Sequence, residues 1–297
     1  MSGKWTMRKS LFYLTGSVCA TLSLSFGGYS AWSKHSQKKL QDEKYKVVSI
    51  IQTGPEKEAL KTTYLAELLG LSTDHPISLY AIDIRQAETK LLSSPVIKSA
   101  FVKRMPPNVL YIDYEVRKPV ALIADYRNTA VDAEGYLFPL TPFFSPKEIP
   151  EIYLGLPPFG AGADALGRKG GQWLAPLENP LWKIALDVLH FLEESPWKEG
   201  FRVKRIDVSN ALAPSLGQRE IVLFTDEEWV EYSCVFPKIL RISPKDYEQQ
   251  LNNFFVLRRN MEEAYRKQLG SITTPTRFAT RIIDLRIPQL AFVQNQN

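Results

Sequence analysis

The chain has 297 residues, of which 44% are hydrophobic and 23% are charged, a balance that is ordinary for a folded protein and excludes disorder over most of the length. Its formal net charge is +5, but residues 1–10 and 34–46 each carry +3, which leaves −1 for residues 47–297. A nucleic-acid-binding protein should carry its positive charge on the domain that contacts phosphate, so this distribution argues against that class.

The first predicted element is an uncharged segment over residues 11–33, with basic residues on both sides. A helix of this length spans roughly 30 Å, which is the thickness of the hydrocarbon core of a bilayer. Tyr29 and Trp32 lie near its end, where amphipathic aromatic rings favour the lipid–water interface. We therefore predict a transmembrane helix over residues 11–33.

The lengths of the two flanks of this segment, and not their charges, set the expected topology. Both carry the same basic excess, so charge alone does not orient the helix. A short tail before a large body fits a single-pass protein of the cell inner (cytoplasmic) membrane, with a cytoplasmic tail over residues 1–10, a juxtamembrane spacer over residues 34–44 and an extracytoplasmic, periplasmic bulk. The alternative is a cleaved signal peptide with its apolar region over residues 11–24, although no convincing A-x-A site follows.

Residues 45–118 have the pattern of a small α+β domain. The predicted elements are a strand over Tyr45–Gln52, helices over Glu56–Leu69 and Asp83–Ser93, and two strands on either side of a corner at Met105–Asn108. Asp83 is the expected N-cap of the second helix, with Gln86 three residues on. In the last strand Leu110, Ile112 and Tyr114 share one face. This order describes a small sheet with helices on one face.

Residues 119–297 have a different texture, in which short strands dominate and two helices interrupt them. One helix is predicted over Pro180–Glu194 with Asn179 as its N-cap, and another begins at Ser243. The last predicted strand covers Arg281–Ile287. The predicted fold class is α+β, with an N-terminal transmembrane helix, a small β-α-α-β-β domain and a larger, mostly antiparallel β domain with two helices.

Four motifs follow one another in the second and third parts of the chain. They are P-V-I-K-S-A-F-V at 95–102 leading through 106–114 into R-K-P-V-A at 117–121, V-D-A-E-G-Y-L-F at 131–138, I-P-E-I-Y-L-G at 149–155 and I-D-L-R at 283–286. Their order resembles the FtsQ/DivIB family of bacterial cell-division proteins. Val116 stands where that family usually has Glu, and Ile287 stands where it usually has an aromatic residue.

The resemblance implies a fold and a function. It implies a POTRA domain over residues 45–118 and an FtsQ/DivIB-type β domain over residues 119–297. It further implies a non-catalytic divisome scaffold in cell division and septum formation. Such a scaffold binds small bitopic FtsB/DivIC-like and FtsL-like proteins through its C-terminal strand and the helix before it, and links them to septal peptidoglycan synthesis.

The residues themselves show no catalytic constellation. The histidines His35, His75 and His190 lie far apart in the sequence, and no known hydrolase, metalloprotease or nucleotide-binding motif is present. Residues 160–165 fit a dinucleotide fingerprint, but no clear strand precedes them and no long helix follows. The acidic run at 226–228 is interpreted as a solvated hairpin turn. We therefore predict no enzyme activity, no cofactor and no metal.

The predicted partner-binding residues lie near the C-terminus. Little chain follows the strand Arg281–Ile287, so we expect it to form a sheet edge whose free backbone groups pair with a partner strand. The predicted set is Ile282, Asp284, Arg286, Ile287 and, on the preceding helix, Arg258. A local salt bridge is the alternative for Asp284 with Arg286, and a solvated helix face is the favoured alternative for Arg258.

Two other functions fit parts of the pattern. One is a membrane-anchored envelope-processing enzyme. The other is a different POTRA-containing assembly or secretion factor, although such proteins usually carry repeated POTRA units or a β-barrel, and this chain shows one unit.

Overall fold

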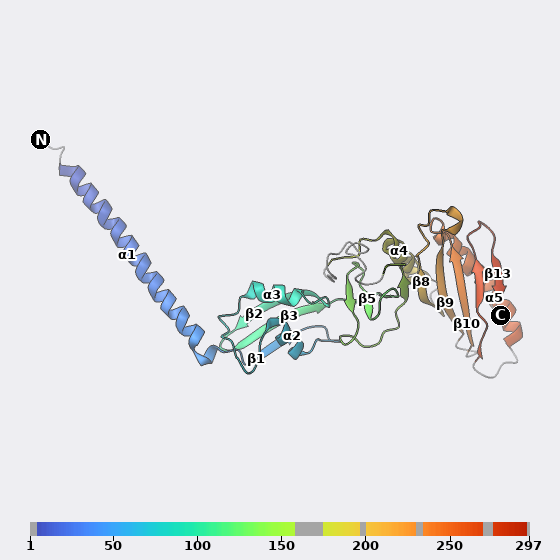
Figure 1. Ribbon diagram of the computed structural model, residues 1–297, viewed down its shortest axis with the longest axis horizontal. Coiled ribbons are helices and arrows are strands. Elements are labelled where there is room, and N and C mark those ends of the chain that lie inside the picture. Colours follow the sequence, from blue (N-terminus) through green and yellow to red (C-terminus); the bar gives the residue numbers. More distant parts are fainter. Residues whose placement is uncertain (1–4, 158–174, 197–199, 230–233, 270–275, 296–297) are drawn as a thin grey trace. The chain divides into compact units, whose positions relative to one another are not determined.

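The computed structural model describes residues 5–157, 175–196, 200–229, 234–269 and 276–295 (Figure 1). The chain divides into two compact units, residues 1–116 and residues 117–297. Each unit has its own sheet, and the two are described separately below.

The first unit begins with α1 (Trp5–Gln41), a single helix of 37 residues. Within the described residues, no helix is both long enough and apolar enough to cross a membrane. The predicted transmembrane helix over residues 11–33, and with it the single-pass location in the inner membrane, is therefore wrong. The prediction counted uncharged length, whereas Ser, Thr and Gly occupy ten of the 23 positions and reduce the gain from transfer into lipid. The predicted spacer over residues 34–44 is also largely helical, because α1 continues to Gln41.

The folded part of the first unit is a three-stranded sheet in the order β1-β3-β2 with two helices. Its elements are η1 (Glu43–Tyr45), β1 (Ser49–Thr53), α2 (Thr62–Leu69), α3 (Ile84–Leu92), β2 (Ile97–Met105) and β3 (Val109–Val116). This is the β-α-α-β-β order expected for residues 45–118. The Asp83 carboxylate accepts the Gln86 N–H at 3.1 Å, so the predicted N-cap of α3 is confirmed. Leu65, Leu91 and Ile112 are fully buried in the core between helices and sheet.

The second unit contains a ten-stranded sheet in the order β13-β12-β10-β9-β8-β7-β4-β5-β6, with β11 also paired to β10. Its first elements are β4 (Ala121–Ile123), β5 (Thr129–Val131), β6 (Leu137–Pro139), β7 (Glu151–Tyr153), α4 (Pro180–Glu194), β8 (Phe201–Asp207) and η2 (Leu216–Gln218). The remaining elements are β9 (Ile221–Trp229), β10 (Cys234–Ile242), α5 (Tyr247–Leu269), β11 (Thr276–Arg277), β12 (Arg281–Asp284) and β13 (Phe292–Asn295).

This sheet is mixed, whereas the sequence predicted only that antiparallel pairs dominate: among the described strands, five pairings are antiparallel and four are parallel. β7 is parallel to both β4 and β8, and β10 is parallel to both β11 and β12. The reason is that each helix of this unit forms a crossover, α4 between β7 and β8, and α5 between β10 and β11. Both helices share one core with the sheet, in which Val188, Phe254 and Leu240 are fully buried.

Two of the motifs noted in the sequence meet at the start of this unit. Arg117 Nη1 donates to Asp132 Oδ2 at 2.7 Å, and both side chains are buried. The other oxygen of Asp132 accepts the N–H groups of Glu134 and Tyr136. Gly135 has φ +86°, and a Cβ there would lie 3.2 Å from the backbone nitrogen of Leu177. The V-D-x-x-G pattern therefore builds a tight turn that Arg117 holds in place.

Candidate partner-docking site

The strand β12 does not form an edge of the sheet. It pairs in parallel with β10 on one side and antiparallel with β13 on the other, where Ile283 stands opposite Val293. The strand also ends at Asp284 rather than at Ile287. The predicted edge strand Arg281–Ile287 is therefore wrong on both points, because the short strand β13 covers it. Four residues without strict alternation gave too weak a pattern to predict β13 from the sequence.

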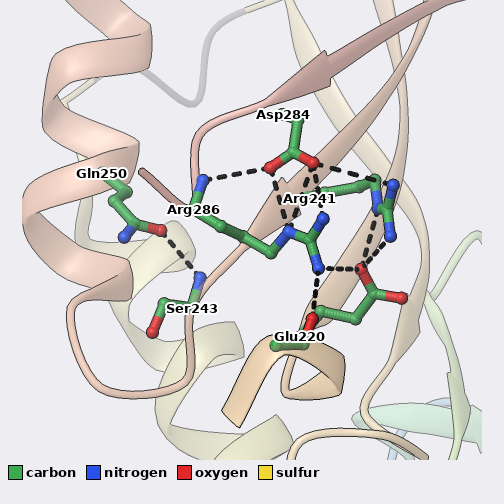
Figure 2. A network of polar contacts seen from close by, with 7 residues as sticks. Glu220, Arg241, Ser243, Gln250, Asp284 and Arg286 are labelled. Carbon is green, nitrogen blue, oxygen red and sulfur yellow. Dashed lines mark hydrogen bonds and ion pairs between the residues drawn. The ribbon is translucent and has the colours of Figure 1, made fainter. Parts of the chain in front are cut away.

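Asp284 and Arg286, both predicted to contact a partner, bind each other instead. Arg286 Nη2 lies 2.7 Å from Asp284 Oδ2, and the backbone N–H of Arg286 donates to Asp284 Oδ1 at 3.1 Å. Arg241 of β10 and Glu220, which precedes β9, complete an acid–base cluster (Figure 2). Glu220 Oε2 lies 2.6 Å from Arg241 Nη2 and 3.2 Å from Arg286 Nη1. Two acids and two bases leave this cluster neutral.

The cluster also shifts the pKa values of its members. Burial alone would raise the pKa of Asp284, but hydrogen bonds from Arg286 and the charge of Arg241 outweigh it and hold that pKa below its ordinary value. The hydrogen bond to Asp284 raises the pKa of Arg286. Both groups are therefore charged at neutral pH, and the cluster fixes the end of β12 against β10 and β9.

A hollow of about 510 Å³ lies between α5 and the turn that joins β12 to β13. The helix contributes mainly polar side chains, from Asp246, Gln249, Gln250, Asn253 and Leu257. The turn contributes Leu285, Ile287, Pro288, Gln289, Leu290 and Ala291. The Gln250 side chain accepts the Ser243 N–H at 2.7 Å, which ties the start of α5 to the end of β10 (Figure 2).

Apolar side chains are exposed around this hollow. Ile287 is 50% exposed, Leu290 55%, Phe292 56% and Val293 49%. Ile287 lines a second hollow of about 340 Å³ as well, together with Phe292, Leu216 and Arg286. Of the predicted set, Ile287 is thus the residue with a large exposed apolar surface. It forms an exposed patch with Phe292 beside the second hollow, whereas Val293 lies on the opposite face of β13.

Apart from its short length of four residues, the strand β13 lacks the usual protection of a sheet edge. Among the described strands, none pairs with its outer side. The sequence from 288 to 297, PQLAFVQNQN, contains no charged residue. Natural edge strands usually carry Lys, Pro or a bulge, because unpaired N–H and C=O groups invite pairing with another chain. An uncharged edge with exposed apolar side chains is therefore a candidate docking surface for an extended segment.

Arg258 lies apart from the other predicted residues and is buried. Its Nε donates to Glu227 Oε1 at 2.8 Å, near the end of β9, whereas the acid–base cluster lies at the start of that strand. Lys238 also pairs with Glu227, and Trp229 Nε1 donates to it at 2.9 Å. Arg258 is therefore neither exposed for docking nor part of a solvated helix face. It neutralises a buried carboxylate.

The acidic run at 226–228 is likewise misread as a turn, because it belongs to β9. Asp226 and Glu227 are 4% and 1% exposed. Burial alone would raise the pKa of Asp226, but Lys204 and Arg277 outweigh it and lower that pKa below its ordinary value. Arg277 Nη1 lies 3.0 Å from Asp226 Oδ2, which attaches β11 to the sheet. The signal that was missed is the strand pattern beginning at Ile221, which continues through the acids to Trp229.

No catalytic or metal centre emerges from the described residues. His75 and His190 are both exposed. No group of three or more His, Cys, Asp or Glu side chains in the described part of the chain could hold a metal ion. The glycine-rich sequence at 160–165 lies outside the described residues.

Comparisons with known proteins add no family assignment. No family model matches the chain, and no curated protein matches it. Membership of the FtsQ/DivIB family stays a prediction that rests on the four motifs.

Proposed function

We propose that the chain is a non-catalytic scaffold of bacterial cell division. In this role it binds small FtsB/DivIC-like and FtsL-like proteins and links them to septal peptidoglycan synthesis. The order of the four motifs supports the family, and the arrangement of the C-terminal end of the large sheet supports the mode of binding.

The observation that carries the proposal is the unprotected edge at β13, next to a hollow lined by α5. Backbone pairing supplies affinity for an extended segment, and the apolar side chains around the hollow supply specificity. Ile287 stands at the centre of this surface because it lines both hollows. The buried cluster of Asp284 and Arg286 acts as a support that fixes the strand rather than as a contact.

A matched pair of substitutions tests this proposal. Ile287 and Phe101 are 50% and 54% exposed, and Phe101 lies on β2 of the first unit. We expect the tagged full chain to capture FtsB/DivIC-like and FtsL-like partners from detergent-solubilised bacterial membranes. Ile287→Lys should lower the recovery roughly tenfold, since about 1.5 kcal/mol of apolar burial is lost. Phe101→Lys should leave the recovery unchanged.

Two results would contradict the proposal. The first is that the unchanged chain captures no such small protein under conditions that preserve membrane complexes. The second is that Ile287→Lys and Phe101→Lys capture it equally well, which would move the docking surface away from this end of the sheet.

A further inference from the structure

β12 is fixed mainly by contacts with the part of the sheet that lies away from β13. Ile283 is fully buried, and the Leu285 N–H donates to the Arg241 carbonyl of β10 at 2.9 Å. The acid–base cluster that fixes the end of β12 draws its members from residues 220, 241, 284 and 286, and none from β13. The backbone groups of β12 that face β13 are thus held in place by the rest of the sheet.

β13 itself is held mainly by its backbone. It pairs with β12 through four residues, from Phe292 opposite Asp284 to Asn295 opposite Arg281. Phe292 and Val293 remain half exposed while paired, so they add little apolar burial. Segments with few buried apolar contacts open locally at low cost.

The turn that leads into β13 is also loosely supported. It lies over the hollow of about 510 Å³ instead of packing directly against α5. Gln289 within it has φ +62°, a left-handed conformation that is strained for a residue with a side chain. One backbone bond, from the Leu290 N–H to the Ile287 carbonyl at 3.2 Å, closes the turn.

We infer that β13 is an exchangeable strand, which occupies the edge of β12 in cis until an extended partner segment replaces it there. The inference rests on the proposed docking function and places the partner strand on β12 in place of β13, rather than on the outer side of β13. The incoming segment runs antiparallel to β12, in the register of Phe292–Asn295, and is uncharged with an apolar residue opposite Ile283. Exchange replaces the backbone hydrogen bonds of β13 with those of the partner segment. Only chains in which β13 is open can bind, so the apparent affinity equals the intrinsic affinity multiplied by the open fraction.

Two variants of the full chain fix the strand in opposite states. A disulfide between Arg281→Cys and Asn295→Cys, which stand opposite each other, locks β13 onto β12. It is made in a Cys19→Ser background, which removes a competing thiol. The other native cysteine, Cys234, is buried. Gln294→Pro opens β13, because Gln294 stands opposite Ile282, whose backbone groups face β13, and a proline there cannot donate its ladder hydrogen bond. Circular dichroism checks that each variant is folded, and dithiothreitol releases the lock.

The probe is a fluorescent synthetic peptide with the sequence of residues 288–297, and a scrambled peptide is its control. We expect the peptide to bind the Gln294→Pro chain roughly tenfold or more tightly than the unchanged chain. We expect no binding to the oxidised lock, and binding equal to that of the unchanged chain once the lock is reduced. Equal binding to the oxidised lock and the unchanged chain would overturn the inference, because the peptide would then add outside β13. No gain with Gln294→Pro would overturn it as well.

These outcomes separate the exchange mechanism from the docking function. A locked chain that still captures the FtsB/DivIC-like or FtsL-like partner contradicts exchange and leaves docking intact. Failure of the unchanged chain and of the Gln294→Pro chain to capture any such partner contradicts docking itself.

Discussion

The edge strands β2 and β13, one in each sheet, differ in how they are protected against pairing with another chain. In the first unit, the edge strand β2 carries Lys98, Lys103 and Arg104, and its register shifts between Ile97 and Ser99. The Glu88 carboxylate of α3 accepts the Val102 N–H at 3.0 Å and so occupies a backbone donor of that strand. In the second unit, β13 is uncharged and exposes Phe292 and Val293. The contrast indicates that β2 is built to remain unpaired and that β13 is built to exchange or to pair.

The largest expected effect separates β12 from β13. Ile283→Ala should lower the free energy of unfolding of the second unit by about 2–5 kcal/mol, because the side chain is fully buried. Val293→Ala, directly opposite on β13, should cost less than about 0.5 kcal/mol because Val293 is 49% exposed. Urea denaturation followed by tryptophan fluorescence measures both. Similar costs for the two substitutions would mean that β13 is part of the core and not a loosely held strand.

A smaller effect tests the protection of β2. Glu88→Ala should destabilise the first unit by about 1 kcal/mol, because the Val102 N–H loses its acceptor. It should also increase self-association in sedimentation experiments, because the edge becomes available for pairing. Glu115→Ala is the matched control, since that carboxylate is exposed and bonds only the Ser99 hydroxyl of β2, at 3.2 Å. An unchanged sedimentation profile for Glu88→Ala would show that the lysines of β2 are enough to protect this edge.

The smallest effect concerns the cluster that supports β12. Since the pKa of Asp284 is lower in the folded chain than in the unfolded one, the ion pair stabilises the fold above the unfolded pKa of about 3.9. That contribution is lost as the pH falls through the folded pKa. Asp284→Asn should therefore cost about 0.5 kcal/mol at pH 7 and flatten the fall in stability below about pH 4. Asp113→Asn, exposed on β3, should leave the pH profile unchanged. Identical profiles for Asp284→Asn and the unchanged chain would show that the cluster does not stabilise β12.

Much of the local structure follows from the sequence. The cap at Asp83, the helix that begins after Asn179 and the alternation through Leu110, Ile112 and Tyr114 act over a few residues, and the structure has each of them. The predicted site was less accurate, because it depended on which strand lies next to β12. Ile287 lies within the exposed patch, whereas Arg258 is buried against Glu227.

The sequence by itself determined the caps of α3 and α4, the bounds of α4 and the order of the small β-α-α-β-β unit, because these depend on neighbours within a few positions. Tertiary structure alone decided the mixed order of the large sheet, the burial of Asp226 and Glu227, and the covering of β12 by β13. These features depend on strands that are far apart in the chain, such as β10 and β12, whose pairing follows from the crossover of α5. A local sequence pattern does not predict which distant strand a segment pairs with, because the energy of pairing is gained only when the whole sheet assembles.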